Sequence, residues 1–279
     1  MIELRKDQQR FLDKLIELDP SNQGYRFEQA KIAAANGDQA RALSILNKLA
    51  PVDTPGYPQA HLVLATQYFE KMARPDQAKS NLDIALKHVN HILTRNKKDP
   101  SAKLLKARIL TKSQDYESAY EEFEELFELN PNHYREMAAL NKLLGREDRN
   151  QPLYEKALAS FQSLAEKEEN QNDDRQWILI ETGIAKTLQK LGRHEEAEIR
   201  HEEMIERYRE DHTGGPRRVF LQRLIADTYI DWASKVADTR ASFNSLPPAT
   251  LEKLLDLYTN AYRNHPKNVV VLQLSLIHI

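Results

Sequence analysis

The sequence contains no cysteine, and glycine and proline are scarce, at 8 and 12 among 279 residues. Without cysteine the chain can form no disulfide and carry out no thiolate chemistry, although this absence says little about the cellular compartment. Most of the few glycines and prolines stand at junctions between segments of helical pattern. Such a composition is typical of a helix-rich protein.

Long apolar runs and an excess of one charge are also absent. The longest mostly apolar stretch, 269–279, is too short to span a bilayer and is interrupted by Gln273 and Ser275. The first residues are polar and do not predict a signal peptide, so the cytoplasm is the default expectation for location. The formal net charge is −2, and we expect neither general attraction to nucleic acid nor membrane insertion.

Helical periodicity is the main signal in the sequence, and it is most regular in residues 100–133. Apolar residues recur there at intervals of three and four, which predicts two amphipathic helices. Asp115 is placed to cap the start of the second helix. Pro131 marks the end of that helix, because a residue that precedes a proline disfavours the α conformation. Each helix is apolar on one face only, so the two must pack together and then against a neighbouring pair. The two apolar stripes are Leu104, Ala107 and Leu110, then Ala119, Phe123, Leu126 and Leu129.

Residues 100–133 resemble a tetratricopeptide repeat (TPR), with small residues at Ala107 and Ala119, bulk at Phe123 and proline at Pro131. The resemblance extends over about residues 5–270 and implies an all-α fold, a right-handed α-solenoid of stacked antiparallel helix pairs. Alanines recur at the corresponding positions in steps of 36, 41, 38 and 40 residues, at Ala42, Ala78, Ala119, Ala157 and Ala197. These steps vary, so we expect helices or loops to be lengthened between repeats.

We expect residues 1–273 to form a single solenoid that is truncated at both ends. A half repeat, 1–22, comes first, unless this is an ordinary N-terminal capping helix; the start of a further helix, 268–273, comes last. Residues 274–279 match one frame of translation of a sequencing-library transposon end and are expected to be an artefact, the alternative being a natural apolar tail. The intervening helix pairs are predicted at about 24–53, 57–98, 100–133, 134–168, 178–211 and 217–266.

No pattern in the sequence predicts catalysis. Residues 194–198 begin like the zinc-protease helix but have glutamate where its second histidine would be. His88 and His91 stand one turn apart with no third ligand evident, so we expect two surface histidines and not a metal site. Neither a glycine-rich phosphate loop nor a Gly-x-Ser-x-Gly motif occurs. We therefore expect no enzyme activity, no cofactor and no metal in this sequence.

Second helices form the outer surface in the resembled family, so their acidic runs are expected to be a solvated face. His201 stands where Phe123 and Phe161 stand, which predicts a partly buried neutral histidine. The acidic residues are Glu121, Glu122, Glu124, Glu125 and Glu128, then Glu195, Glu196, Glu198, Glu202, Glu203 and Glu206.

First helices are the candidate binding surface, because the resemblance implies that they line a concave groove. A cation follows the small residue in several of them, and in two helices another cation lies one turn further on the same face. These cations are Lys31, Arg108 and Lys186, Lys142 in a pair of uncertain register, and then Lys112 and Lys190. The register is uncertain because Asn141 falls where a small residue is usual, and Asp227 breaks the pattern in the last pair. The alternative is that lysine and arginine are simply common exposed helix formers.

These observations predict a non-catalytic scaffold that binds a protein or peptide segment in the groove. A basic stripe favours a segment with acidic residues, and Leu104 would supply apolar contact. The full residue pattern of the clamp that binds chaperone tails is not matched. The alternative prediction is a structural or regulatory arm of a larger protein, such as an enzyme, whose active domain lies outside this sequence.

Overall fold

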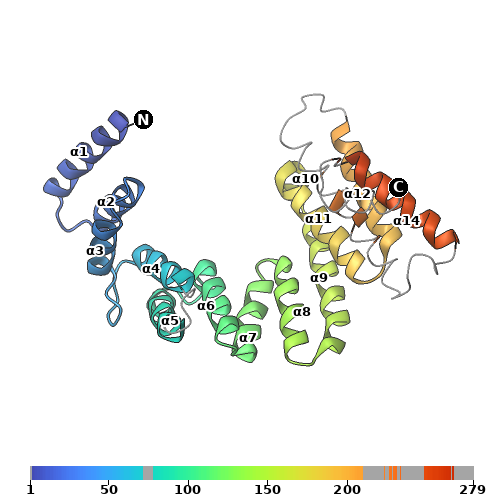
Figure 1. The fold of residues 1–279 in the computed structure, drawn as a ribbon, viewed down its shortest axis with the longest axis horizontal. Coiled ribbons are helices and arrows are strands. Elements are labelled where there is room, and N and C mark those ends of the chain that lie inside the picture. Colours follow the sequence, from blue (N-terminus) through green and yellow to red (C-terminus); the bar gives the residue numbers. More distant parts are fainter. Residues whose placement is uncertain are drawn as a thin grey trace. The chain divides into compact units, whose positions relative to one another are not determined.

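The computed structural model describes residues 2–71, 78–209, 223, 226–227, 229–230, 233, 248–264 and 266. Every regular element among these residues is a helix, and the predicted all-α solenoid of stacked helix pairs is confirmed (Figure 1). The chain divides into two compact units, residues 1–147 and 148–279. The predicted helix start at 268–273 and the expected artefact at 274–279 lie outside the described residues.

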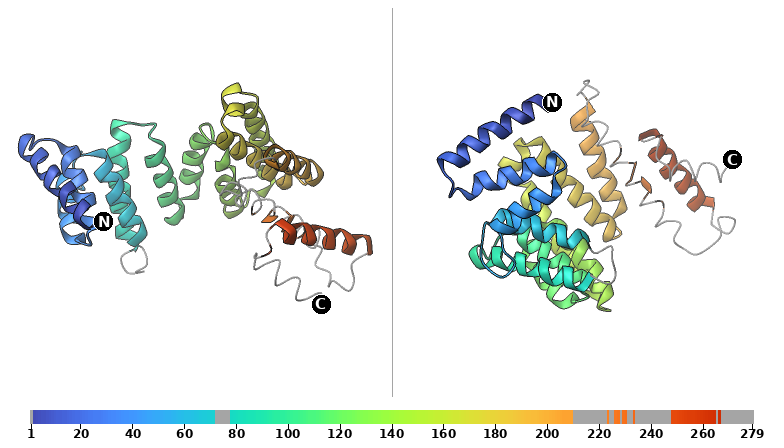
Figure 2. Two further views of the ribbon diagram at one scale, coloured as in Figure 1. Left: turned by 90° about the horizontal axis from the view of Figure 1, so that it is seen from above. Right: turned by 60° about the vertical axis from the view of Figure 1, so that its left-hand side comes forward.

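The first unit is a stack of helices in chain order, as the two further views in Figure 2 also show. Three pairs pack closely, α2 with α3, α4 with α5 and α6 with α7, and each pair also contacts the next. A short 3-10 helix, Pro131–His133, precedes α8. The α-helices are α1 (Ile2–Leu18), α2 (Gln23–Ala35), α3 (Gln39–Leu49), α4 (Pro58–Glu70), α5 (Ala78–Arg95), α6 (Pro100–Lys112), α7 (Tyr116–Phe127) and α8 (Tyr134–Leu143).

Small residues stand where the helices of the first unit meet. Ala85, Ala107 and Ala119 are all fully buried, which lets neighbouring helices approach closely while larger side chains fill the space around them. Two apolar clusters result, one over α2 to α4 and one over α4 to α6. Neither helix of a pair could bury its apolar face alone, so the stack is stable only as a series of contacts between neighbours.

The second unit begins with a 3-10 helix, Glu147–Arg149, that spans the boundary. Here α11 packs against both α9 and α12. A separate apolar cluster joins Ile178 of α11 to Leu254, Leu257 and Ala261 of α14. The α-helices are α9 (Asn150–Ala165), α10 (Glu168–Asn172), α11 (Asp174–Lys190), α12 (His194–Arg209) and α14 (Pro248–Asn264).

Four helices, α2, α6, α8 and α11, end in the same hydrogen-bonded turn. After α6, the N–H of Gln114 donates to the carbonyl of Thr111, and the N–H of Asp115 donates to the carbonyl of Leu110. The residue between, Gln114, has a φ of 64°, in the left-handed region. This pairing is a Schellman turn, which satisfies carbonyls that the helix itself leaves unpaired. The left-handed residues are Gly37, Gln114, Gly145 and Gly192.

Candidate functional site

The shared turn aligns the first helices of the repeats and corrects the register of α8. Counting back seven residues from the left-handed position gives Ala138 in α8, which is buried. Asn141 was assigned from the sequence to the position where a small residue is usual, but its backbone carbonyl instead accepts the turn's hydrogen bond from the N–H of Arg146. The same count in the other three helices gives Ala30, Ala107 and Ala185.

With this register, Lys142 does not stand at the position of Arg108. The residue that follows Ala138 is Ala139, which is exposed and uncharged. Lys142 is also exposed, but it corresponds to Thr111 of α6. The expected row of cations is therefore interrupted at α8, and a role for Lys142 in binding a partner stays a prediction.

The remaining predicted cations of the first unit differ in their surroundings. Arg108 and Lys112 are exposed on one face of α6 and form no ion pair with any described residue. Lys31 is also exposed, but its Nζ lies 2.9 Å from a carboxylate oxygen of Glu28 on the same helix. The Lys31 ammonium also lies 5.9 Å from the centroid of the Phe27 ring. Lys31 is thus already engaged by its own helix, whereas Arg108 and Lys112 are open to a partner.

Leu104 lies one turn before Arg108 on α6 and is half-buried. It lines a shallow pocket of 190 Å³ together with Leu126, Leu129 and His133, which follow or end α7. Leu129 is 64% exposed, so apolar surface remains available here. The structure therefore places Leu104, Arg108 and Lys112 on successive turns of one helix.

In the second unit, Lys186 is half-buried and Lys190 is exposed on α11. Close to Lys186, His201 of α12 is buried, and its pKa is lowered to about 4. Burial is the main cause of this low pKa, and the charge of Lys186 adds to it. The sequence predicted a partly buried neutral histidine here, and the structure buries it more deeply, with 2% of its surface exposed.

One acidic side chain of α7 is not part of a solvated face, contrary to the prediction. The Glu122 side chain is only 13% exposed and lies 3.2 Å from Lys103 Nζ and 2.6 Å from Lys106 Nζ. Lys103 is itself buried and also pairs with Glu125 at 2.7 Å. Burial alone would lower the pKa of Lys103, but the two carboxylates outweigh it and raise the pKa. These ion pairs join α6 to α7 on the side away from Arg108.

The prediction of two surface histidines is wrong for His88. His88 is 1% exposed, and its Nδ1 lies 2.8 Å from Nδ1 of His61, which is equally buried on α4. The Tyr68 ring stacks on His88 with 5.9 Å between ring centroids. His91 is half-buried and its Nε2 lies 3.0 Å from the carbonyl oxygen of Val52. No group of three potential metal ligands occurs among the described residues.

Comparison with known families identifies the repeat. Residues 100–133 match the sequence model of the tetratricopeptide repeat family. The chain therefore contains a tetratricopeptide repeat at residues 100–133. Such repeats generally serve as scaffolds for protein–protein interaction and are typically not catalytic. The matched residues are those of α6, α7 and the 3-10 helix that follows, and they include Leu104, Arg108 and Lys112.

Solved structures similar to this chain have low sequence identity to it. A tetratricopeptide repeat protein from Parabacteroides merdae is 16% identical with a TM-score of 0.45, over 95% of this chain and 89% of that one. Pseudomonas aeruginosa PilF is 15% identical with a TM-score of 0.44, over 91% and 96%. The protein TTC0263 of Thermus thermophilus is 18% identical with a TM-score of 0.40, over 77% and 95%. The search of curated proteins gave no match.

Among the described residues, no helix is both long enough and apolar enough to cross a bilayer.

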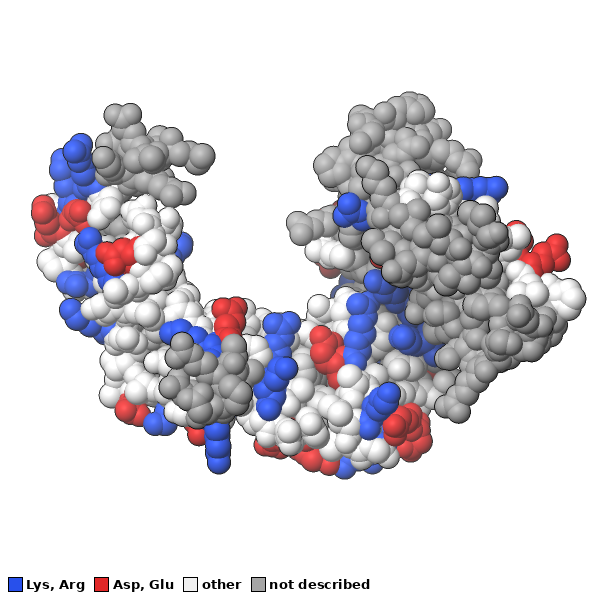
Figure 3. Space-filling model, viewed as in Figure 1, with Lys and Arg blue, Asp and Glu red and all other residues white. Residues whose placement is uncertain are grey.

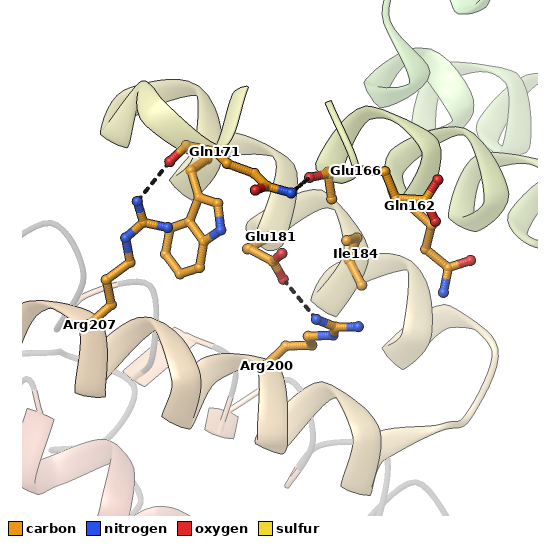
Figure 4. A pocket seen from close by; sticks show the side chains of 9 residues that line it. Gln162, Glu166, Gln171, Glu181, Ile184, Arg200 and Arg207 are labelled. Carbon is orange, nitrogen blue, oxygen red and sulfur yellow. Dashed lines mark hydrogen bonds and ion pairs between the residues drawn. The ribbon is translucent and has the colours of Figure 1, made fainter. Parts of the chain in front are cut away.

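The second unit contains a larger pocket that the sequence reasoning missed. It has a volume of 630 Å³ and lies between α9, α10, α11 and α12 (Figure 4). The signal that could have revealed it is Glu181, which interrupts an apolar stripe on α11 at the spacing of Trp177, Ile184 and Leu188. A charged residue in such a stripe is either paired in the core or exposed to a cavity. The pocket-lining side chains that matter below are Trp177, Glu181, Ile184, Arg200 and Arg207.

Proposed function

We propose that this tetratricopeptide repeat protein is a non-catalytic scaffold that binds an acidic protein or peptide segment on α6 and its neighbours. The observation that carries the proposal is the pair Arg108 and Lys112, exposed one turn apart in the matched repeat with no described ion-pair partner. Carboxylates of a bound segment would supply the missing partners.

Two acidic residues of the neighbouring helix α7 already have other cationic partners. On α7, Glu122 and Glu125 are engaged by Lys103 and Lys106. Figure 3 shows cations and anions interspersed over the visible face, so a partner must match particular side chains and not a uniform field. Selection by position is therefore the expected basis of specificity.

The free energy of an exposed ion pair limits what Arg108 and Lys112 would contribute to binding. An exposed ion pair is worth about 0.2–1 kcal/mol, and it is screened over about 8 Å at physiological ionic strength. Arg108 and Lys112 would thus set the orientation and association rate of a segment more than its affinity. Apolar contact has to supply most of the remaining binding free energy.

Apolar surface is present beside the cations. Leu104 is half-buried on α6, and Leu143 on α8 is 56% exposed. By the shared turn, Leu143 occupies in α8 the position that Lys112 occupies in α6. A segment that carries an acidic residue next to a large apolar one would complement both helices. Partner binding by the other candidate lysines stays a prediction beside this proposal. These are Lys31, Lys142, Lys186 and Lys190.

The test is a peptide-array screen at two salt concentrations on the wild type and on the Arg108→Glu, Lys112→Glu double variant. We expect the variant to lose acidic peptides and to show weaker dependence on salt. The matched control is Lys48→Glu with Arg95→Glu, which reverses the same two charges at exposed positions in the last turns of the second helices α3 and α5. If the first variant and the control select the same peptides as the wild type, Arg108 and Lys112 do not bind the partner.

A further inference from the structure

The pocket of the second unit is organised around a buried carboxyl group. Glu181 is 5% exposed, and its Oε2 accepts no hydrogen bond from any described group. Arg200 Nη1 is the nearest cation, at 3.6 Å, which is beyond hydrogen-bond distance (Figure 4). Burial raises the pKa of Glu181, and the charge of Arg200 opposes this only in part. A buried acceptor without a donor is unfavourable, so this site favours a ligand that brings a donor.

Hydrogen-bond donors lie on the opposite wall of the same pocket. Arg200 and Arg207 both come from α12, two turns apart. The Arg207 guanidinium lies 4.2 Å from the centroid of the Trp177 ring and donates to the carbonyl of Gln171 at 2.8 Å. These contacts hold Arg207 in place beside the indole. Arg200 is also paired with Glu203 at 3.3 Å, and its side chain is 37% exposed.

The charges around the pocket decide which ligand class fits. The lining includes the carboxyl groups of Glu166 and Glu181 and the guanidinium groups of Arg200 and Arg207. A carboxylate ligand would meet Glu181, and an ammonium group would meet the two guanidinium groups. An uncharged group with a donor and an acceptor side by side avoids both penalties.

We infer that this pocket binds a carboxamide, the side chain of glutamine or asparagine in a partner segment. The amide N–H donates to Oε2 of Glu181, and the amide oxygen accepts from the guanidinium of Arg200. The aliphatic part of the side chain packs against Ile184 and Trp177. The site lies in the second unit and does not rest on the function proposed for α6.

The test uses the full chain and four blocked pentapeptides, acetyl-Ala-Ala-X-Ala-Ala-N-methylamide, in which X is glutamine, glutamate, lysine or leucine. The readout is the indole N–H signal of Trp177 in a ¹⁵N–¹H spectrum. The chain has 2 tryptophans, and a Trp232→Phe variant assigns the signal. We expect the glutamine peptide to shift it at concentrations where the other three do not. Equal shifts with the leucine peptide, a stronger response to glutamate or lysine, or no response at all would each overturn the inference.

Variants of Glu181 and Arg200 distinguish a role in binding the peptide from a role in the stability of the fold. Glu181→Leu removes the acceptor and should weaken the glutamine peptide about tenfold or more, because the site can no longer accept its N–H. Replacing a buried carboxyl by an apolar side chain should leave the melting temperature unchanged or higher. Arg200→Leu, at a half-exposed position, should also weaken binding and serves if Glu181→Leu does not fold. Binding that survives both changes contradicts the assignment.

The controls also keep this inference apart from the proposed function. Glu195→Gln is an exposed change on α12 outside the pocket, and we expect wild-type binding of the glutamine peptide. The Arg108→Glu, Lys112→Glu variant lies in the other unit and should leave the Trp177 response unchanged. If the peptide array shows no role for Arg108 and Lys112 but the glutamine peptide still shifts the Trp177 signal, only the function proposed for α6 is wrong. The reverse pair of results would show that only the pocket assignment is wrong.

Discussion

Gln114 adopts a backbone conformation that glycine adopts in the three equivalent turns. Its φ is 64°, against 86°, 66° and 76° for Gly37, Gly145 and Gly192. A side chain in this left-handed region is crowded against the following carbonyl, at a cost of roughly 1–2 kcal/mol. The repeat that matches its family best therefore carries local strain that the other three turns avoid.

Replacing this residue should relieve the strain. We expect Gln114→Gly to raise the free energy of unfolding by about 0.5–1 kcal/mol, because the gain exceeds the extra chain entropy that glycine loses on folding. Urea unfolding followed by circular dichroism measures the change. Ser113→Gly is the control, since Ser113 is right-handed at a φ of −76° and glycine should destabilise it. A loss of stability in Gln114→Gly would show that its side chain makes contacts that outweigh the strain.

The buried histidine pair predicts a pH dependence of stability. Burial lowers the pKa of His61 and of His88 to about 4, and the neighbouring imidazoles add to the effect. In the unfolded chain both have the ordinary value of 6.5. Between these values the unfolded state binds more protons than the folded state. Stability should therefore fall as the pH is lowered from about 6.5 towards 4.

The measurement is the urea midpoint at several pH values in that window for wild type and for the His61→Gln, His88→Gln double variant. We expect a flatter pH dependence in the variant, because neither glutamine titrates there. His201 has the same low pKa in both proteins, so the difference in slope reports the pair alone. Parallel curves would mean that the two imidazoles do not drive the acid response.

Sequence reasoning predicted some of these residues and could not predict others. The cap at Asp115 was predictable because this residue precedes an apolar periodic segment, and its side chain accepts the backbone N–H of Ser118. The burial of His88 was not readable, because His61 lies on another helix, 27 residues away. Contacts between helices depend on packing that no single segment encodes.

At the scale of the helix, the register of α8 shows the same limit. Residues 137–140 offer two adjacent alanines, so periodicity alone does not decide which one faces the neighbouring helix. The hydrogen bond from Arg146 to Asn141 decides it. Glu181 was missed for a different reason: helical periodicity places it on the buried face of α11, but only the neighbouring helices α9, α10 and α12 create the pocket.

The packing of α9 against α11 depends on the absence of a side chain at Gly183. A Cβ atom there would lie 2.5 Å from Cε1 of Phe161, which is buried at 1% exposure. We expect Gly183→Ala to destabilise the protein by roughly 1–3 kcal/mol through overpacking. This loss should appear even though alanine favours the helix over glycine by about 1 kcal/mol.

A double-mutant cycle tests that contact. Phe161→Leu alone should destabilise by leaving a cavity, but combined with Gly183→Ala it should cost less than the two changes separately. Thermal melts of the four proteins give the coupling. Additive effects would mean that the alanine methyl group meets something other than the Phe161 ring.

At the scale of the whole chain, each described apolar cluster lies within one of the two units. The clusters of the first unit use buried residues from Ala30 to Ile109, and the cluster of the second uses residues from Ile178 to Ala261. Because helices of a solenoid are stabilised mainly by their neighbours, we expect the first unit to keep most of its stabilising contacts when it is separated.

The first unit should therefore fold when it is expressed alone. We expect a 1–147 fragment to be helical and to unfold cooperatively in urea. A 1–112 fragment is the matched comparison, since it removes α7 and exposes the apolar face of α6, and it should be markedly less stable. A 1–147 fragment without a cooperative transition would show that the boundary at Glu147 does not separate independent folding units.

The 2.8 Å contact between the Nδ1 atoms of His61 and His88 also fixes how protons are shared. One ring must donate at Nδ1 while the other accepts there, so two neutral imidazoles in this contact hold opposite tautomers. Whichever ring donates has a bare Nε2, and the other carries its proton on Nε2. A substitution at either residue therefore forces the remaining imidazole to find a new tautomer or a new partner. Positions 61 and 88 are expected to change together across related proteins.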